Sequence, residues 1–106
     1  MSPLTPKALN TFERIFLIVS AIPYGCVASY GEIAEMVPIP SARIVGFALA
    51  SLEGSQVNIP WHRVVNHEGE ISLRRLDRML VQKELLLSEG IEFNKKGRID
   101  LEVYGW

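Results

Sequence analysis

The sequence has very few residues of the kinds that form disulfides or bind metals. Of its 106 residues, one is cysteine, Cys26, and two are histidine. A single cysteine cannot form a disulfide within the chain, and these three side chains are too few for the usual structural zinc sites. We therefore expect no disulfide, no metal site and no cofactor.

Long hydrophobic segments are missing as well. The richest apolar stretch, residues 16–21, lies between Arg14 and Pro23 and is far shorter than the ~20 residues that span a bilayer. The N-terminus has no basic segment followed by the apolar core of a signal peptide. We expect a cytoplasmic protein that does not contact membranes. The length and the 48% of hydrophobic residues predict one folded domain over residues 1–106.

The chain also lacks a strong excess of charge. Its formal net charge of −1 argues against a protein held to nucleic acid by bulk electrostatics. Residues 71–83 nevertheless hold four basic residues against Asp77 alone, whereas residues 84–106 hold five acidic residues against three basic ones. This local basic patch either contacts a few phosphates or is an ordinary solvated helix face. The cations that we expect to be able to face DNA are Arg43, Arg63, Arg74, Arg75 and Arg78.

Apolar spacing predicts a first helix near the N-terminus. Thr5 is placed to cap it and Pro6 suits its first turn. Apolar residues then recur at helical spacing until Pro23 and Gly25 end the helix.

A helix-turn-helix is predicted next. The run Ser29–Glu32 is a capping box that places a short helix over about 30–37. Ser41 begins a second helix that reaches about residue 52, with Gly54 as its C-cap. Two short helices joined by a proline-bearing turn indicate a helix-turn-helix, although many helical domains contain such a corner.

The second half of the chain mixes extended segments with one helix. Residues 64–65 and 70–72 flank a turn at 66–69 and predict a small hairpin. A helix is predicted over about 76–89, and the turn at 94–97 indicates a second hairpin in the tail. The expected fold is mainly α: a single helix-turn-helix, winged-helix-like domain with one or two small β-hairpins.

Four segments, in this order along the chain, resemble the alkylguanine-DNA alkyltransferases. They are IPYGCVASYGEIA at 22–34, SARIVG at 41–46, IPWHRVV at 59–65 and LLSEG at 86–90. In that family the corresponding segments are the DNA-binding segment, the recognition helix, the active-site signature and the closing helix. The resemblance implies the C-terminal-type domain of the alkyltransferases, and binding to double-stranded DNA that contains an O6-alkylated guanine.

Trp61 is the main departure from the family pattern. The resemblance places it where the alkyltransferases have the cysteine that accepts the alkyl group. That chemistry needs a thiolate, which an indole cannot replace. Cys26 matches no catalytic position and is expected to be a small, partly buried residue. The sequence is therefore similar to the alkyltransferase-like branch, which binds the lesion without repairing it, and we expect no enzymatic activity and no catalytic residue.

The other pocket residues are carried over from the same resemblance. His62 matches the histidine beside the acceptor, and Glu89 matches the glutamate that orients this histidine. With no nucleophile present, a hydrogen bond between them is expected to be structural. We also expect Val64 of the signature segment to line the lesion pocket. Arg74, thirteen residues after Trp61, matches the position of a binding-loop tyrosine and is expected to cover the flipped guanine through cation–π contact, with Arg75 as the competing candidate.

Tyr30 and Arg43 match the residues that extrude the base. Removing a base from the stack costs a few kcal/mol, so one group must displace the phosphate and another must fill the gap. The resemblance gives Tyr30 the first role and Arg43 the second. Ala42, Gly46 and Ala48 are expected to keep the helix slim enough for the minor groove. Without the resemblance, Tyr30 would be an ordinary capping-box residue and Arg43 a solvated charge.

Two other interpretations compete with lesion binding. A helix-turn-helix regulator would explain residues 30–52 but not the segment at 60–65, and we find no dimerisation segment. An enzyme that activates water with His62 and Glu89 would also need a leaving-group acid or a metal.

We expect a monomer that flags the lesion for nucleotide excision repair. The short turn 38–40 and Glu53, where the family usually has asparagine, depart from the pattern.

Overall fold

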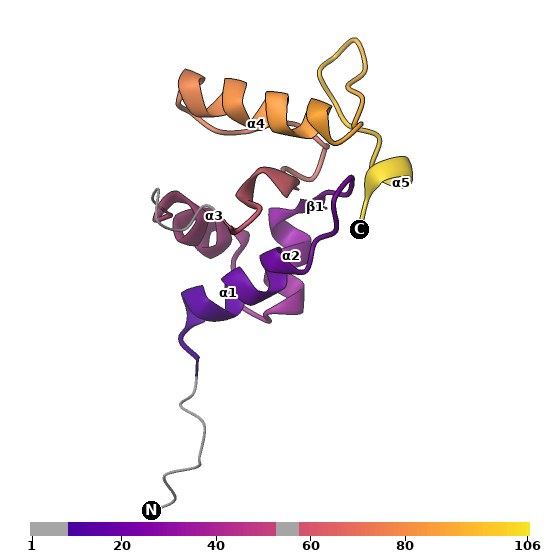
Figure 1. The fold of residues 1–106 in the computed structure, drawn as a ribbon. Helices are drawn as coiled ribbons and strands as arrows, with labels where there is room; N and C mark the ends of the chain where they lie inside the picture. Colours follow the sequence, from indigo (N-terminus) through magenta and orange to yellow (C-terminus); the bar gives the residue numbers. More distant parts are fainter. Residues whose placement is uncertain (1–8, 53–57) are drawn as a thin grey trace, which may run out of the picture.

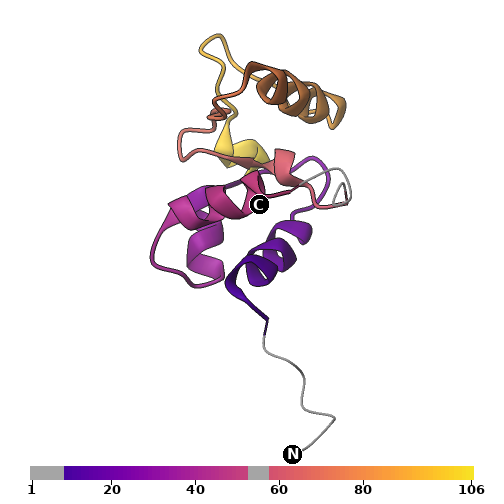
Figure 2. The same ribbon diagram turned by 90° about the vertical axis from the view of Figure 1, so that its left-hand side faces the viewer.

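The computed structural model describes residues 9–52 and 58–106. The elements, in chain order, are helix α1 (Thr11–Ser20), strand β1 (Ala28–Ser29), helix α2 (Tyr30–Met36), helix α3 (Ala42–Ala50), the 3₁₀ helix η2 (Trp61–Arg63), strand β2 (Val64–Val65), helix α4 (Leu76–Ser88) and helix α5 (Leu101–Tyr104). Helices α1 to α3 form one group, and α4 lies at the other end of the molecule (Figures 1 and 2). The predicted fold class, mainly α around a helix-turn-helix, is confirmed.

Helix α1 begins later than predicted. Asn10 is its N-cap, because the Asn10 side chain accepts a hydrogen bond from the Glu13 N–H and the Glu13 carboxylate accepts one from the Asn10 N–H. This reciprocal pair satisfies free donors at the helix start, so the helix begins at Thr11. The prediction placed the start too early, at Thr5, which lies outside the described residues. The inner face of the helix buries Ile15 and Val19 completely.

The two helices of the helix-turn-helix follow the predicted signals. Ser29 and Glu32 form the expected capping box at the start of α2. The Ser41 side chain accepts from the Arg43 N–H at the start of α3. Helix α3 ends at Ala50, slightly earlier than predicted, and Gly54 lies outside the described residues. Helices α1, α2 and α3 pack on one another around a hydrophobic core, called the first core below, whose buried residues include Ile15, Val19, Ile33 and Val45.

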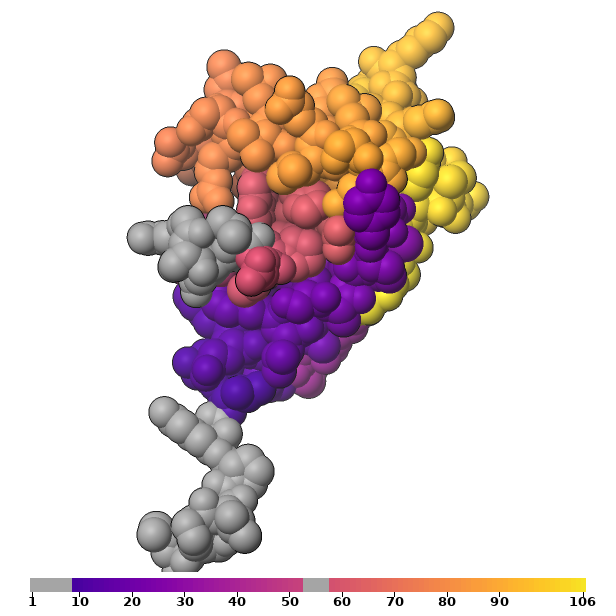
Figure 3. Space-filling view, viewed as in Figure 1, coloured from indigo at the N-terminus to yellow at the C-terminus, as the bar shows by residue number. Residues whose placement is uncertain are grey.

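A two-stranded parallel sheet separates two hydrophobic cores. Strand β1 pairs with β2 in the register Ala28 opposite Val64 and Ser29 opposite Val65. Side chains alternate along extended backbone. Ala28 and Val64 therefore belong to the core of α1–α3, whereas Val65 and the preceding Val27 belong to the core beneath α4. In the space-filling view, residues that precede and form β2 (pink) lie between α4 (orange) and the N-terminal helices (indigo to purple) (Figure 3).

The pairing of β2 corrects the first predicted hairpin. The turn at 66–69 forms, and Asn66 N–H donates to the Glu70 carbonyl (3.0 Å), but β2 pairs with β1 instead of with residues 70–72. Glycine at position 69 allows a close contact between this turn and the tail. Its φ is +80°, and a Cβ there would lie 2.3 Å from the Ile99 carbonyl oxygen. The backbone after the turn therefore packs against the tail.

The tail is partly as predicted. Phe93 and Ile99 form an antiparallel bridge around the turn at 94–97, as expected for the second hairpin. Residues 101–104, for which no helix was predicted, form the short helix α5, because the Asp100 side chain caps it by accepting from the Glu102 N–H. None of the described helices is long and apolar enough to cross a membrane.

Candidate functional site

A pocket of about 730 Å³ opens between α3 and the N-terminal end of α4. Its walls come from α2 and α3, from η2 and from the segment that leads into α4. The lining residues are Tyr30, Ala42, Arg43, Gly46, Phe47, Leu49, Ala50, Trp61, Ser72, Leu73, Arg74, Arg75 and Arg78. Eight of the residues predicted from the sequence meet here: Tyr30, Ala42, Arg43, Gly46, Trp61, Arg74, Arg75 and Arg78. The fold thus brings three distant segments of the chain around one opening.

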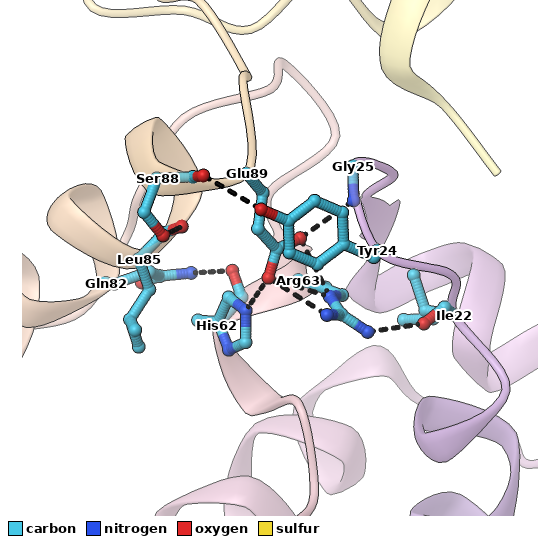
Figure 4. Close-up of polar contacts among 9 residues, drawn as sticks. All are labelled: Ile22, Tyr24, Gly25, His62, Arg63, Gln82, Leu85, Ser88 and Glu89. Carbon is cyan, nitrogen blue, oxygen red and sulfur yellow. Dashed lines mark hydrogen bonds and ion pairs between the residues drawn. The ribbon is translucent and has the colours of Figure 1, made fainter.

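Trp61 forms a wall of this pocket. It is the first residue of η2, is half-buried and packs against the first core. The Arg78 guanidinium lies over its ring, with Cζ 5.0 Å from the ring centroid. The neighbouring His62 ring is nearly perpendicular to the indole, at 87°, and is directed towards Glu89 (Figure 4). The 3₁₀ turn therefore separates the two side chains, so that Trp61 faces the pocket and His62 does not line it.

The Glu89 carboxylate accepts hydrogen bonds from three residues in two parts of the chain (Figure 4). His62 Nε2 lies 2.6 Å from Glu89 Oε2, which confirms the predicted hydrogen bond. Arg63 adds its Nε at 3.0 Å from Oε1 and its Nη2 at 2.9 Å from Oε2, and the Gly25 N–H donates to Oε1 at 2.8 Å. Arg63 Nη1 also donates to the Ile22 carbonyl at 2.8 Å. The network joins the end of α4 to η2 and to the loop before β1.

These donors keep the Glu89 carboxylate ionised. Burial alone would raise its pKa, because the side chain is only 5% exposed. The hydrogen bonds from the Arg63 guanidinium, the Gly25 N–H and His62 outweigh burial and lower the pKa of Glu89 to about 2. A carboxylate with this pKa is a fixed counterion and cannot serve as a general base near neutral pH.

Gln82 fixes the backbone of the signature segment to α4. It is 1% exposed, and its Nε2 donates to the His62 carbonyl (3.0 Å) and to the Val64 carbonyl (2.9 Å). The His62 carbonyl lies in η2, which carries Trp61, and the Val64 carbonyl lies in β2 directly after it. Because a buried amide with two such bonds has little freedom, Gln82 holds the Trp61 wall at a constant position relative to α4.

Tyr30 stands at the start of α2 with its ring half-buried against the first core, on the side of the pocket. Burial raises the pKa of the Tyr30 phenol above its ordinary value, and a hydrogen bond with Ser72 opposes this shift only in part. The phenol is therefore a neutral donor and acceptor at the pocket edge.

The exposed face of α3 combines small residues with one cation. Arg43 is exposed in the first turn, with its Cζ 5.9 Å from the Phe47 ring centroid. Gly46 has open space where a Cβ would stand, so nothing inside the protein requires glycine there. Ala48, predicted on this face, is instead fully buried in the core, and Ala50 takes its place beside the pocket. The prediction for Ala48 was wrong because it lies two residues, or about 200° around the helix, from Gly46.

The two candidate lid arginines differ in their surroundings. Arg75 donates to the Asp77 carboxylate from Nη2 (2.9 Å) and Nε (3.2 Å), and both side chains are exposed. Arg74 is exposed at the pocket and takes part in no ion pair within the described part of the chain. Arg74 therefore has the freer guanidinium.

Three predicted residues lie away from the pocket lining. Val64 is 1% exposed in the first core, and His62 and Glu89 belong to the network behind Trp61. Arg63, predicted among the cations able to face DNA, is occupied by Glu89 and only 16% exposed, so that prediction was wrong. Sequence reasoning missed Gln82, and it gave Arg78 only as a cation able to face DNA and not as a neighbour of Trp61, although their spacing of four residues on one predicted helix was a usable signal. No cluster of potential metal ligands occurs among residues 9–52 and 58–106.

Comparisons with known proteins point to one family. The family model described as the DNA-binding domain of 6-O-methylguanine DNA methyltransferase matches residues 10–91. A DNA base-flipping protein of Vibrio parahaemolyticus is 50% identical over 97 residues, covering 88% of this chain and 92% of the relative. Alkyltransferase-like protein 1 of Schizosaccharomyces pombe is 39% identical over 101 residues, covering 90% and 93%.

A solved structure agrees with the sequence relatives. The crystal structure of S. pombe Atl1 in complex with damaged DNA containing O6-carboxymethylguanine superposes with a TM-score of 0.82 at 36% identity. The match covers 95% of this chain and 98% of the other. The fold and the sequence thus lead to the same group of proteins.

Proposed function

The chain belongs to the family of 6-O-methylguanine DNA methyltransferase DNA-binding domains, and from this premise we propose that it binds duplex DNA containing an O6-alkylated guanine and flips that base into the pocket beside Trp61. The relatives named as base-flipping and alkyltransferase-like proteins, and the relative bound to damaged DNA, support this proposal. The same resemblance leads us to propose that the bound lesion is passed to nucleotide excision repair.

The observation that carries the proposal is the convergence at the pocket. Extrusion needs a group at the phosphate, a group that fills the stack and a wall that receives the base. Tyr30, Arg43 and Trp61 come from separate segments, yet they line one opening. A helix-turn-helix regulator that reads base edges would not need an aromatic pocket behind its second helix.

We propose that binding occurs without alkyl transfer. Trp61 occupies the pocket wall, where no thiolate is available. Cys26, the single cysteine, packs against the first core and does not line the pocket. His62 and Glu89 are bound to each other, and the low pKa of Glu89 removes it as a base for activating water.

The direct test is a titration of matched duplexes that differ only by a methyl group on O6 of one guanine. We expect tighter binding to the methylated duplex, because alkylation weakens base pairing and lowers the cost of extrusion. A radiolabelled methyl group should remain on the DNA after incubation with stoichiometric protein. Equal affinity for both duplexes, together with strong dependence on the surrounding sequence, would support a regulator instead, and label in the protein would refute the absence of transfer.

Arg74→Ala should reduce discrimination between lesion and guanine by roughly three- to thirtyfold. The reason is the loss of one cation–π contact with the flipped base, worth about 0.5–2 kcal/mol. The measurement is a pair of titrations, on the methylated and the unmodified duplex, for wild type, Arg74→Ala and Arg75→Ala. A contact to phosphate would weaken both affinities by the same factor. If only Arg75→Ala loses discrimination, Arg75 is the lid.

A further inference from the structure

Among the cations that line the pocket, Arg78 is the one whose guanidinium lies over the Trp61 ring. It is the third residue of α4 and is half-buried, and its guanidinium lies over the Trp61 ring with Cζ 5.0 Å from the ring centroid. Stacking on an aromatic ring occupies the face of a guanidinium and leaves the N–H groups at its edge available. Within the described part of the chain, none of these N–H groups forms a hydrogen bond or ion pair.

The pocket around Arg78 is positively charged. Four arginines line it, and no aspartate or glutamate of the described residues does. The four are not equivalent: Arg75 is bound to Asp77, Arg43 lies over Phe47 on α3, and Arg74 is exposed at the opening. Arg78 is therefore the cation next to the wall that receives the alkyl group in the proposed function.

We propose that Arg78 makes the pocket selective for guanine adducts whose alkyl group ends in a carboxylate. The inference rests on the proposed function, since it places the alkyl group against Trp61. A substituent that extends along the indole meets the edge of the guanidinium, which matches the two oxygens of a carboxylate. The half-buried setting strengthens this contact, because fewer water molecules screen the charges than at an open surface.

Comparing two adducts of the same shape, one charged and one neutral, separates the effect of charge on binding from the effect of size. The test uses duplexes that carry O6-carboxymethylguanine or its neutral amide analogue, O6-carbamoylmethylguanine, with O6-methylguanine and guanine duplexes as references. We expect wild type to bind the carboxymethyl duplex roughly ten- to hundredfold more tightly than the carbamoylmethyl duplex, as hydrogen bonds to charged groups contribute about 1.5–3 kcal/mol. Arg78→Gln should reduce this ratio to near one.

A matched control is available on the same helix. Lys83 lies outside the pocket, and its Nζ is 5.4 Å from the centroid of the Phe93 ring, so Lys83→Gln removes one positive charge without touching the site. This variant should keep the wild-type ratio. Arg78→Lys, which keeps the charge but loses the planar fork, should give an intermediate ratio. Urea unfolding of each variant identifies any that does not fold, in which case the wild-type ratio and Arg78→Lys still decide.

Two results would overturn the inference. Equal wild-type affinity for the carboxymethyl and carbamoylmethyl duplexes would show that charge is not recognised. An equal loss of affinity for all four duplexes in Arg78→Gln would show that Arg78 contacts a backbone phosphate. Failure of the proposed function has a different signature, which is equal wild-type affinity for the O6-methylguanine and guanine duplexes.

Discussion

Replacing Glu89 by glutamine is expected to lower the free energy of unfolding by about 3 kcal/mol at pH 7. The carboxylate is 5% exposed and neutralises Arg63, which is itself only 16% exposed. Glutamine keeps the size of the side chain but leaves the Arg63 charge buried without a counterion. The same value follows from the pKa of about 2 against an ordinary 4.5, because each pKa unit corresponds to about 1.4 kcal/mol.

The pH dependence provides an independent measurement of the same network. Because the pKa of Glu89 is lower in the folded protein, its stabilisation is complete above pH 4.5 and is lost as the pH falls towards about 2. Urea unfolding at several pH values should show this loss in wild type and a weaker dependence in Glu89→Gln. Asp77→Asn, which breaks the exposed pair with Arg75, is the matched control. If the two variants lose equal stability, the Glu89 network does not hold the fold together.

Much of the helical framework follows from local sequence signals. The Ser29–Glu32 capping box and Ser41 fix the start of α2 and α3 through side chains only two or three residues from the groups they bind. Such local signals are visible without knowledge of the fold. The pairing of β2 with β1 is different, since it joins residues 36 positions apart and two residues per strand carry no register information.

The candidate site was predicted only in part, for a related reason. The resemblance identified Trp61, His62 and Glu89, and the His62–Glu89 hydrogen bond is present. It did not indicate that Arg63 would bind the same carboxylate, because an arginine next to a histidine looks like a free cation in the sequence. Arg78 was recognised as a cation near DNA but not as the partner of Trp61, since the crossing of α4 over η2 is a tertiary feature.

Arg43→Ala should lower affinity for the lesion duplex by roughly ten- to hundredfold and should nearly abolish base extrusion. Arg43 is exposed at the start of α3. The neighbouring Gly46 has open space where a Cβ would stand, so this face of the helix can approach a DNA groove closely. In the proposed complex its guanidinium fills the vacated stack, and stacking on a base contributes about 1–3 kcal/mol. Alanine removes this contact, so the extruded state loses the group that prevents the base from returning.

A 2-aminopurine base at the target position reports extrusion, because its fluorescence rises when stacking is lost. Wild type should give a large increase, Arg43→Ala almost none, and Arg43→Lys a small one, since lysine keeps the charge but has no planar group to stack. Lys95→Ala, in the tail turn and outside the pocket lining, should behave as wild type. Wild-type fluorescence in Arg43→Ala would show that Arg43 is not the stacking residue. The α3 helix would then meet DNA in another orientation, with its cation on a phosphate and its small residues away from the groove.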